Sequence, residues 1–149
     1  MSVTLELERF VLAQEDAGTY ERAVAELRAG RKRSHWMWFV FPQIAGLGES
    51  AMSRRYAIAS IDEARAYLEH PVLGTRLLEC ARIVSELHVA SAQDVFGVVD
   101  TLKLHSSMTL FARAADEEQT PCHDVLARYF DGARDAATER ILDVGAPPS

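Results

Sequence analysis

Apolar residues recur every three to four positions along most of the chain, a spacing typical of amphipathic α-helices. Serine, threonine and aspartate precede several of these segments as N-caps, while glycine and proline interrupt the pattern between them. The pattern therefore predicts an all-α fold, a single compact domain of seven to eight helices. The segments predicted to be helical are 5–14, 20–29, 59–70, 72–88, 91–96, 98–115, 121–130 and 135–142.

The pattern is ambiguous at HWMWFVF, residues 35–41, because both alternate phases of this stretch are apolar. Period alone cannot separate a buried strand from a buried helix in such a run. A short irregular or extended stretch at 35–41 therefore stays open beside the helical interpretation. Residues 42–50, PQIAGLGES, contain a proline and two glycines and are predicted to be loop.

Composition restricts the class of protein. A chain of 149 residues fits one domain with a sizeable core, which we expect over residues 1–144, with a flexible tail at 145–149. The net charge of −6 argues against broad binding to nucleic acid or to anionic membranes. No apolar run reaches membrane-spanning length, and the acidic first residues are not typical of a signal peptide. We therefore expect a soluble protein without a membrane partner.

The cysteines point to the same conclusion. Cys80 and Cys122 lie far apart, and no CxxC pair or metal-ligand spacing occurs in the sequence. Neither a disulfide framework nor a metal site is predicted, and no motif indicates a cofactor. A reducing compartment fits best, so we expect a cytoplasmic location.

Basic and aromatic residues concentrate in RKRSHWMWFVFPQ, residues 31–43. On one interpretation the aromatic side chains are core, and the cations follow a helix C-terminus, where positive charge is favourable. On the other, the stretch is one wall of a ligand pocket, because indoles offer flat apolar faces and cations hold anionic groups. The candidate ligand-binding residues from this stretch are Lys32, Arg33, His35, Trp36, Trp38 and Gln43.

A second candidate stretch is VVDTLKLHSSMTLF, residues 98–111. At about 100° per residue, Asp100, Lys103 and Ser107 fall within one sector of about 60° on a helix. The first interpretation is structural: an ion pair between Asp100 and Lys103 three residues apart, with serines bonded back to the helix. The second presents Lys103 and Ser107 to a ligand. His35 and Asp100 are the candidate acid–base residues, because imidazole titrates near neutral pH and a carboxylate can orient a nucleophile.

The blocks GRKRSHWMWFVFPQ and KLHSSMTLF resemble an uncharacterised bacterial family, a domain of unknown function sometimes labelled calpastatin-like. The resemblance extends from Phe10 to about Leu142 and implies a compact all-helical fold. It supplies no activity and no catalytic residues. One departure lies at Cys122, where the family pattern leads us to expect an aromatic residue. The calpastatin label does not suit this chain, because such an inhibitor is disordered and this composition folds.

Two hypotheses for function follow. The first is a pocket for a small anionic ligand of the nucleotide or ADP-ribose type, with or without hydrolytic activity. The second is a protein-interaction or adaptor domain without catalytic activity, whose aromatic block is core. Nucleic-acid binding is disfavoured by the acidic balance. The sequence leaves the reaction, the pathway and the oligomeric state open.

Overall fold

The computed structural model describes residues 3–48 and 50–145, and within them it is all-α, as predicted. One isolated parallel bridge, between Ile44 and Ile58, ties two loops together. None of the described helices is long and apolar enough to cross a membrane. The helices are α1 (Val3–Glu15), η1 (Asp16–Gly18), α2 (Thr19–Arg28), α3 (Met37–Val40), α4 (Ala51–Arg55), α5 (Ile61–Glu69), α6 (Leu73–Glu86), α7 (Ala92–Ala114), α8 (Pro121–Tyr129) and α9 (Ala136–Gly145).

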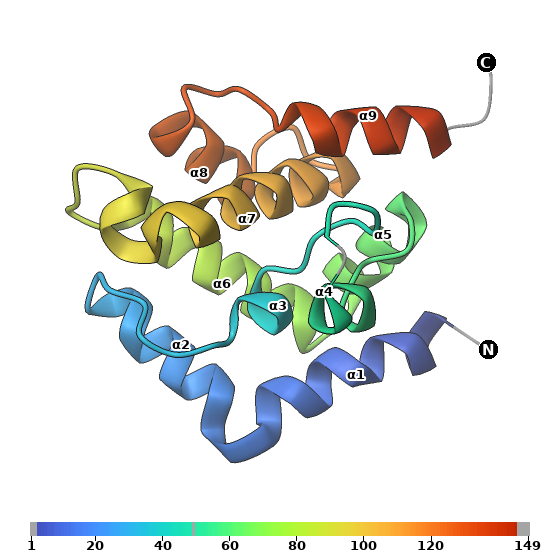
Figure 1. Ribbon diagram of the computed structural model, residues 1–149, viewed down its shortest axis with the longest axis horizontal. Coiled ribbons are helices and arrows are strands. Elements are labelled where there is room, and N and C mark those ends of the chain that lie inside the picture. Colours follow the sequence, from blue (N-terminus) through green and yellow to red (C-terminus); the bar gives the residue numbers. More distant parts are fainter. Residues whose placement is uncertain (1–2, 49, 146–149) are drawn as a thin grey trace.

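The helices stack in three tiers (Figure 1). Helices α1 and α2 form one outer tier, α5, α6 and α7 the middle tier, and α8 and α9 the opposite outer tier. The close approach of α5 and α6 depends on Gly74, where a Cβ atom would lie 1.9 Å from the carbonyl oxygen of Leu68. Helix α7 crosses the centre and packs against α5, α8 and α9. Its position allows it to form one wall of the groove described below.

Aromatic contacts join the tier of α1 and α2 to the middle tier. Phe10 of α1 packs edge-on against Tyr67 of α5, with ring centroids 5.3 Å apart, and Tyr67 in turn lies 5.2 Å from Phe111 of α7. Trp36 and Phe41, on either side of the α3 turn, are also among the largest fully buried side chains. Such contacts between ring edges and faces favour a fixed arrangement beyond the area that they bury.

Side-chain caps begin the helices where the sequence predicts them. The hydroxyl oxygens of Ser60 and Ser91 accept hydrogen bonds from the backbone amides three residues later, and Thr120 caps α8 ahead of Pro121. Gly97 interrupts α7, as predicted, because its φ of 78° and ψ of 174° leave the helical region. The segment after Gly97 is therefore a helix with its own direction and its own exposed first turn.

Two short helices lie outside the predicted set. Met37–Val40 forms one helical turn, so the extended alternative for residues 35–41 is wrong, while residues 31–36 are irregular. Ala51–Arg55 forms α4, with Ser50 as its cap, although five residues are too few to show a period. Of the predicted tail at 145–149, Gly145 ends α9 and residues 146–149 lie outside the described part of the chain.

Candidate functional site

A groove of about 420 Å³ runs beside α7, between the loop after α3 and the start of α9. Its volume lies within the range of small-molecule sites, and its lining is mostly apolar with a few polar groups. Helices α3, α4, α7 and α9 and the 43–48 loop all contribute to it. The lining residues are Trp38, Gln43, Leu47, Gly48, Ser50, Ser53, Val99, Leu102, Lys103, Ser106, Asp135 and Ala137.

Helix α7 supplies one complete face of the groove. Val99, Leu102, Lys103 and Ser106 follow the i, i+3, i+4, i+7 spacing that places side chains on one stripe of a helix. The break at Gly97 sets where this stripe begins, and the hydroxyl of Thr101 donates to the Gly97 carbonyl at 2.6 Å across the first turn. Solvent exposure decreases along this stripe, since Val99 and Leu102 are exposed while Ser106 is buried.

The sequence contains two lysines, and both pair with the same carboxylate. Lys32 Nζ lies 2.9 Å from Asp100 Oδ2, and Lys103 Nζ lies 3.4 Å from Asp100 Oδ1. The pairing between Asp100 and Lys103 confirms the ion pair predicted from their spacing. These side chains are only 9%, 19% and 21% exposed for Lys32, Asp100 and Lys103, so solvent screens them weakly. Two cations against one carboxylate leave this cluster with a net positive charge.

Lys103 also covers Trp38. Its ammonium lies 3.9 Å from the centroid of the indole ring, a distance at which a cation is attracted to the ring face. Trp38 is partly buried and packs against the core as well as lining the groove. The indole therefore acts as a platform that fixes the position of the ammonium.

Polar groups at the floor are ordered by hydrogen bonds. The amide nitrogen of Gln43 donates to the hydroxyl of Ser106 at 2.6 Å, and that hydroxyl donates to the Lys103 carbonyl at 3.1 Å. These two hydrogen bonds join the loop after α3 to the groove face of α7. The amide oxygen of Gln43 and the Lys103 ammonium are thus presented on a rigid support.

Asp135 adds a carboxylate to the lining of the groove. One of its oxygens accepts hydrogen bonds from the Thr138 amide at 3.1 Å and the Thr138 hydroxyl at 2.6 Å. It therefore caps α9, as predicted, and the positive end of the helix offsets part of its charge. Among the described residues, the groove lining therefore contains one cation, Lys103, and one carboxylate, Asp135, whose charge is partly offset by the helix.

Trp36 lies in the core, away from the groove lining. It is 0% exposed, and its indole nitrogen donates to Glu26 Oε1 at 2.8 Å. The Glu26 carboxylate also accepts hydrogen bonds from the backbone amides of Arg33 and Ser34 and from the Ser34 hydroxyl. Burial raises the pKa of Glu26, but these hydrogen bonds outweigh it and lower the pKa to about 2. Glu26 therefore holds the 33–36 loop as a fixed anion.

The remaining predicted site residues are separated by the fold. Arg33 and His35 are exposed on the 31–36 loop, and neither belongs to the lining of the groove. Ser107 is completely buried, and its hydroxyl oxygen has no hydrogen-bond partner among the described residues. Of the predicted set, Trp38, Gln43 and Lys103 meet in the groove, while Lys32 and Asp100 act on it through Lys103.

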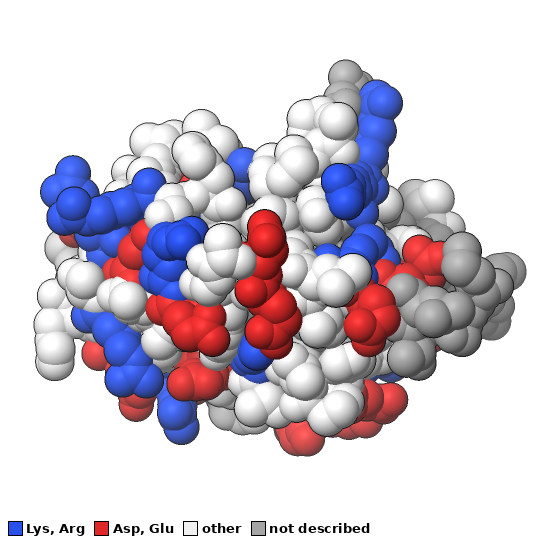
Figure 2. Space-filling model, turned by 90° about the horizontal axis from the view of Figure 1, so that it is seen from below, with Lys and Arg blue, Asp and Glu red and all other residues white. Residues whose placement is uncertain are grey.

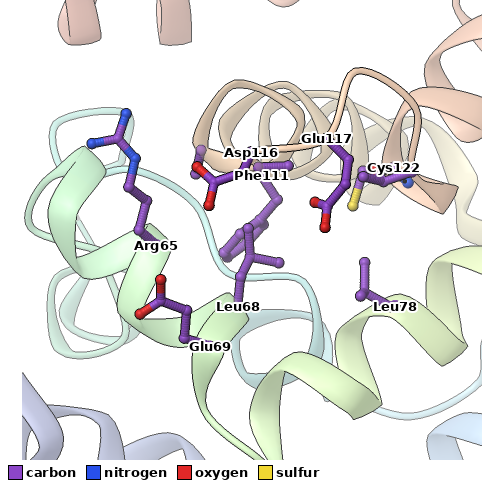
Figure 3. A pocket seen from close by; sticks show the side chains of 11 residues that line it. Arg65, Leu68, Glu69, Leu78, Phe111, Asp116, Glu117 and Cys122 are labelled. Atoms are coloured by element: carbon purple, nitrogen blue, oxygen red, sulfur yellow. Dashed lines mark hydrogen bonds between the residues drawn. The ribbon is translucent and has the colours of Figure 1, made fainter.

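A smaller cavity of about 160 Å³ lies near the C-terminal end of α7 and is lined by residues of α5, α6, α7 and α8 (Figure 3). Glu69 reaches its rim from one side, and Asp116 and Glu117 from the other. Cys122 lines it at the position where an aromatic residue was expected. Burial raises the pKa of the Cys122 thiol to about 12, so the sulfur is protonated and is not a nucleophile at neutral pH.

Basic and acidic side chains are interspersed on the face formed by α1 and α2, which gives no continuous positive surface in this view (Figure 2). Within residues 3–48 and 50–145, no group of three or more His, Cys, Asp or Glu side chains could hold a metal ion.

The fold and the groove define a small all-α domain with a cation-bearing groove along its longest helix. The chain belongs to the family described as "Protein of unknown function (DUF1810)", whose model matches residues 4–142. This confirms the resemblance to an uncharacterised family. The chain is also similar to a solved structure, the conserved hypothetical protein Rv1873 from Mycobacterium tuberculosis. The two are 52% identical, with a TM-score of 0.88, over 93% of this chain and 96% of that one. No curated protein matches.

Proposed function

We propose that the groove beside α7 binds a small anionic ligand, and that the protein does so in the cytoplasm. The observation that carries the proposal is the Lys103 ammonium, which lines the groove and belongs to a cluster with two cations and one carboxylate. An anion placed against Lys103 would balance this cluster. Because the groove is partly shielded from water, the attraction would exceed that of an exposed lysine.

The proposal is one of binding. Asp100 is engaged by two lysines, and the exposed His35 lies outside the groove lining, so the two candidate acid–base residues do not meet there. Hydrolysis of an ADP-ribose-type ligand would need a proton donor or acceptor within reach of the bond. Nucleotides and ADP-ribose derivatives nevertheless remain one arm of the test, because their phosphates suit Lys103.

A thermal-shift panel of nucleotides, ADP-ribose, sugar phosphates and carboxylates tests the proposal. A ligand at a hundred times its dissociation constant adds about 2.7 kcal/mol of stability. Lys103→Met keeps the aliphatic stem and removes the charge, so it should abolish the shift. Arg140→Met, which removes an exposed cation of α9, is the matched control and should leave the shift intact. Equal shifts in both variants would overturn the proposal.

An interaction domain is the second candidate, because three large apolar side chains are exposed on the first turn after Gly97. Val98, Val99 and Leu102 are 64%, 65% and 65% exposed. Exposed apolar groups that gather in one place are typical of contact surfaces. Val98 is not part of the groove lining, so Val98→Ser separates the two functions. It should weaken the binding of a protein partner and leave the ligand-induced shift unchanged.

A further inference from the structure

We infer that the ligand of this groove is an aliphatic acid, a free molecule whose carboxylate or phosphate head group lies at Lys103 and whose hydrocarbon chain follows the outer turn of α7. The inference rests on the proposed function, since it takes the same groove as the site. It narrows the ligand from any small anion to one that is amphiphilic.

The aromatic surface expected to stack a flat ring is occupied. The Lys103 ammonium lies 3.9 Å from the centroid of the Trp38 ring and covers it, and this partly buried indole also packs against the core. Trp36 is 0% exposed. A nucleobase that stacked on Trp38 would have to displace the ammonium that its own phosphate needs. The groove therefore offers the charge for an anion without an open ring face beside it.

The groove offers aliphatic surface in place of an aromatic platform. Val99 and Leu102 line it and are each 65% exposed, and Leu47 is a further apolar lining residue. Val99 lies one helical turn before Lys103, and a turn rises about 5.4 Å along the axis. A chain bound by its head group at Lys103 could follow this turn toward the Gly97 break. Covering these side chains would remove apolar surface from water, which favours binding in proportion to the area.

The charges fix the orientation and favour a free molecule over a membrane surface. The head group belongs at Lys103, because the cluster there is net positive, whereas the Asp135 carboxylate of the lining would repel an anion. A cationic or neutral head group would gain nothing from the cluster. The whole chain carries a net charge of −6, which repels a bilayer that displays the same head groups.

Calorimetric titration with octanoate, decanoate, octyl phosphate, 1-octanol and AMP, below any micelle concentration, tests the inference. The acids should bind, and decanoate should bind roughly tenfold more tightly than octanoate because it buries two more methylenes. The heat-capacity change on binding should be negative and should grow with chain length. We expect 1-octanol and AMP to bind at least tenfold more weakly than the acid of eight carbons.

Two variants locate the parts of the ligand. Lys103→Met should erase the preference for octanoate over 1-octanol. Leu102→Ser should reduce the gain from octanoate to decanoate to about threefold or less. Leu12→Ser is the matched control, because Leu12 is 68% exposed on α1, far from the groove lining, and its loss should change neither.

The outcomes separate this inference from the proposed function. If AMP or a sugar phosphate binds through Lys103 while the acids bind no better as the chain lengthens, the inference is overturned and the proposed function stands. If no anion binds the wild-type protein, both are overturned. Equal binding of 1-octanol and octanoate would overturn the anionic head group, and binding only to micelles or vesicles would overturn the free ligand. If the acids bind Lys103→Met and Leu102→Ser as tightly as the wild-type protein, the groove is not their binding site.

Discussion

The 31–36 loop is attached to the helices by two carboxylates that are used in opposite ways. Glu26 of α2 accepts from four donors, all of them in Arg33, Ser34 and Trp36. Asp100 of α7 holds Lys32 of the same loop and also Lys103, which lines the groove. The first cluster keeps a negative charge, but four neutral donors of the loop occupy the carboxylate oxygens, so the anion serves to hold the loop. The second cluster has one more cation than carboxylate, and one of its cations lines an open groove. The first cluster therefore determines shape, whereas the second has a charge placed where a ligand could reach it.

The largest effect should come from opening the Glu26 cluster. Glu26→Ala leaves four donors without their acceptor, so we expect the free energy of unfolding to fall by about 2–3 kcal/mol. Urea denaturation, followed by tryptophan fluorescence and circular dichroism, measures the change. Glu8→Ala removes an exposed glutamate of α1 and should change stability by less than about 0.5 kcal/mol. A loss no greater than that of Glu8→Ala would show that the cluster does not hold the loop.

Asp100→Asn should have the next largest effect on stability and the opposite effect on binding. Lys32, only 9% exposed, loses its counter-charge, which should lower the free energy of unfolding by about 1–2 kcal/mol. The affinity for anions should rise severalfold, because the cluster gains a unit of positive charge. Asp62→Asn breaks an exposed pair with Arg65 of the same spacing and is the control. An affinity that falls would contradict the role assigned to Asp100.

The pH dependence of stability should also report the Glu26 cluster. The pKa of Glu26 is lowered in the folded protein, to about 2 from an ordinary 4.5. Its stabilisation is therefore fully present above pH 4.5 and is lost as the pH falls toward 2. The difference in unfolding free energy between the wild type and Glu26→Gln, measured by denaturation at each pH, should shrink across this window. A difference that stays constant down to pH 2 would contradict the assignment.

Replacing Lys103 should have the smallest effect on stability, but it should affect anion affinity more than replacing Lys32 does. Lys103→Met should lower the free energy of unfolding by less than about 1 kcal/mol, because Lys103 is the more exposed and more distant partner of Asp100. It should nevertheless reduce anion affinity at least tenfold. Lys32→Met should reduce affinity less, since it leaves the Lys103 ammonium in the groove. Calorimetric titration and urea denaturation of both variants measure this. If Lys103→Met and Lys32→Met lose the same amount of affinity, Lys103 is not the lysine that contacts the ligand.

Local signals determine most of the helices. Ser60, Ser91, Thr120 and Asp135 cap helices where the sequence predicts caps, and Gly97 breaks α7 at the predicted residue. These features depend on side chains within a few residues of each other. The α3 turn was ambiguous because all its neighbours are apolar, so the choice between strand and helix depends on what packs around it.

The site was predictable only in part, because it depends on contacts between distant segments. The pair of Asp100 and Lys103 follows from spacing on one helix, whereas Lys32 joins them from 68 positions away, a distance that no local pattern reports. The predicted sector of α7 and its groove face overlap only at Lys103. The predicted sector contains Ser107, which is buried, whereas the groove receives Ser106 and Leu102. Nothing in the sequence distinguishes the two neighbouring serines before the direction of the helix after Gly97 is known.

The sharing of Asp100 also makes the protein simple to label. All of its ε-amines meet at one carboxylate, so an acylating reagent that attacks lysine side chains marks the mouth of the groove and the loop behind it. The Lys103 amine should react first, because its side chain is 21% exposed against 9% for Lys32. Acylation also removes the charge of the Lys103 ammonium, so slower labelling of Lys103 in the presence of a ligand would report that the groove is occupied.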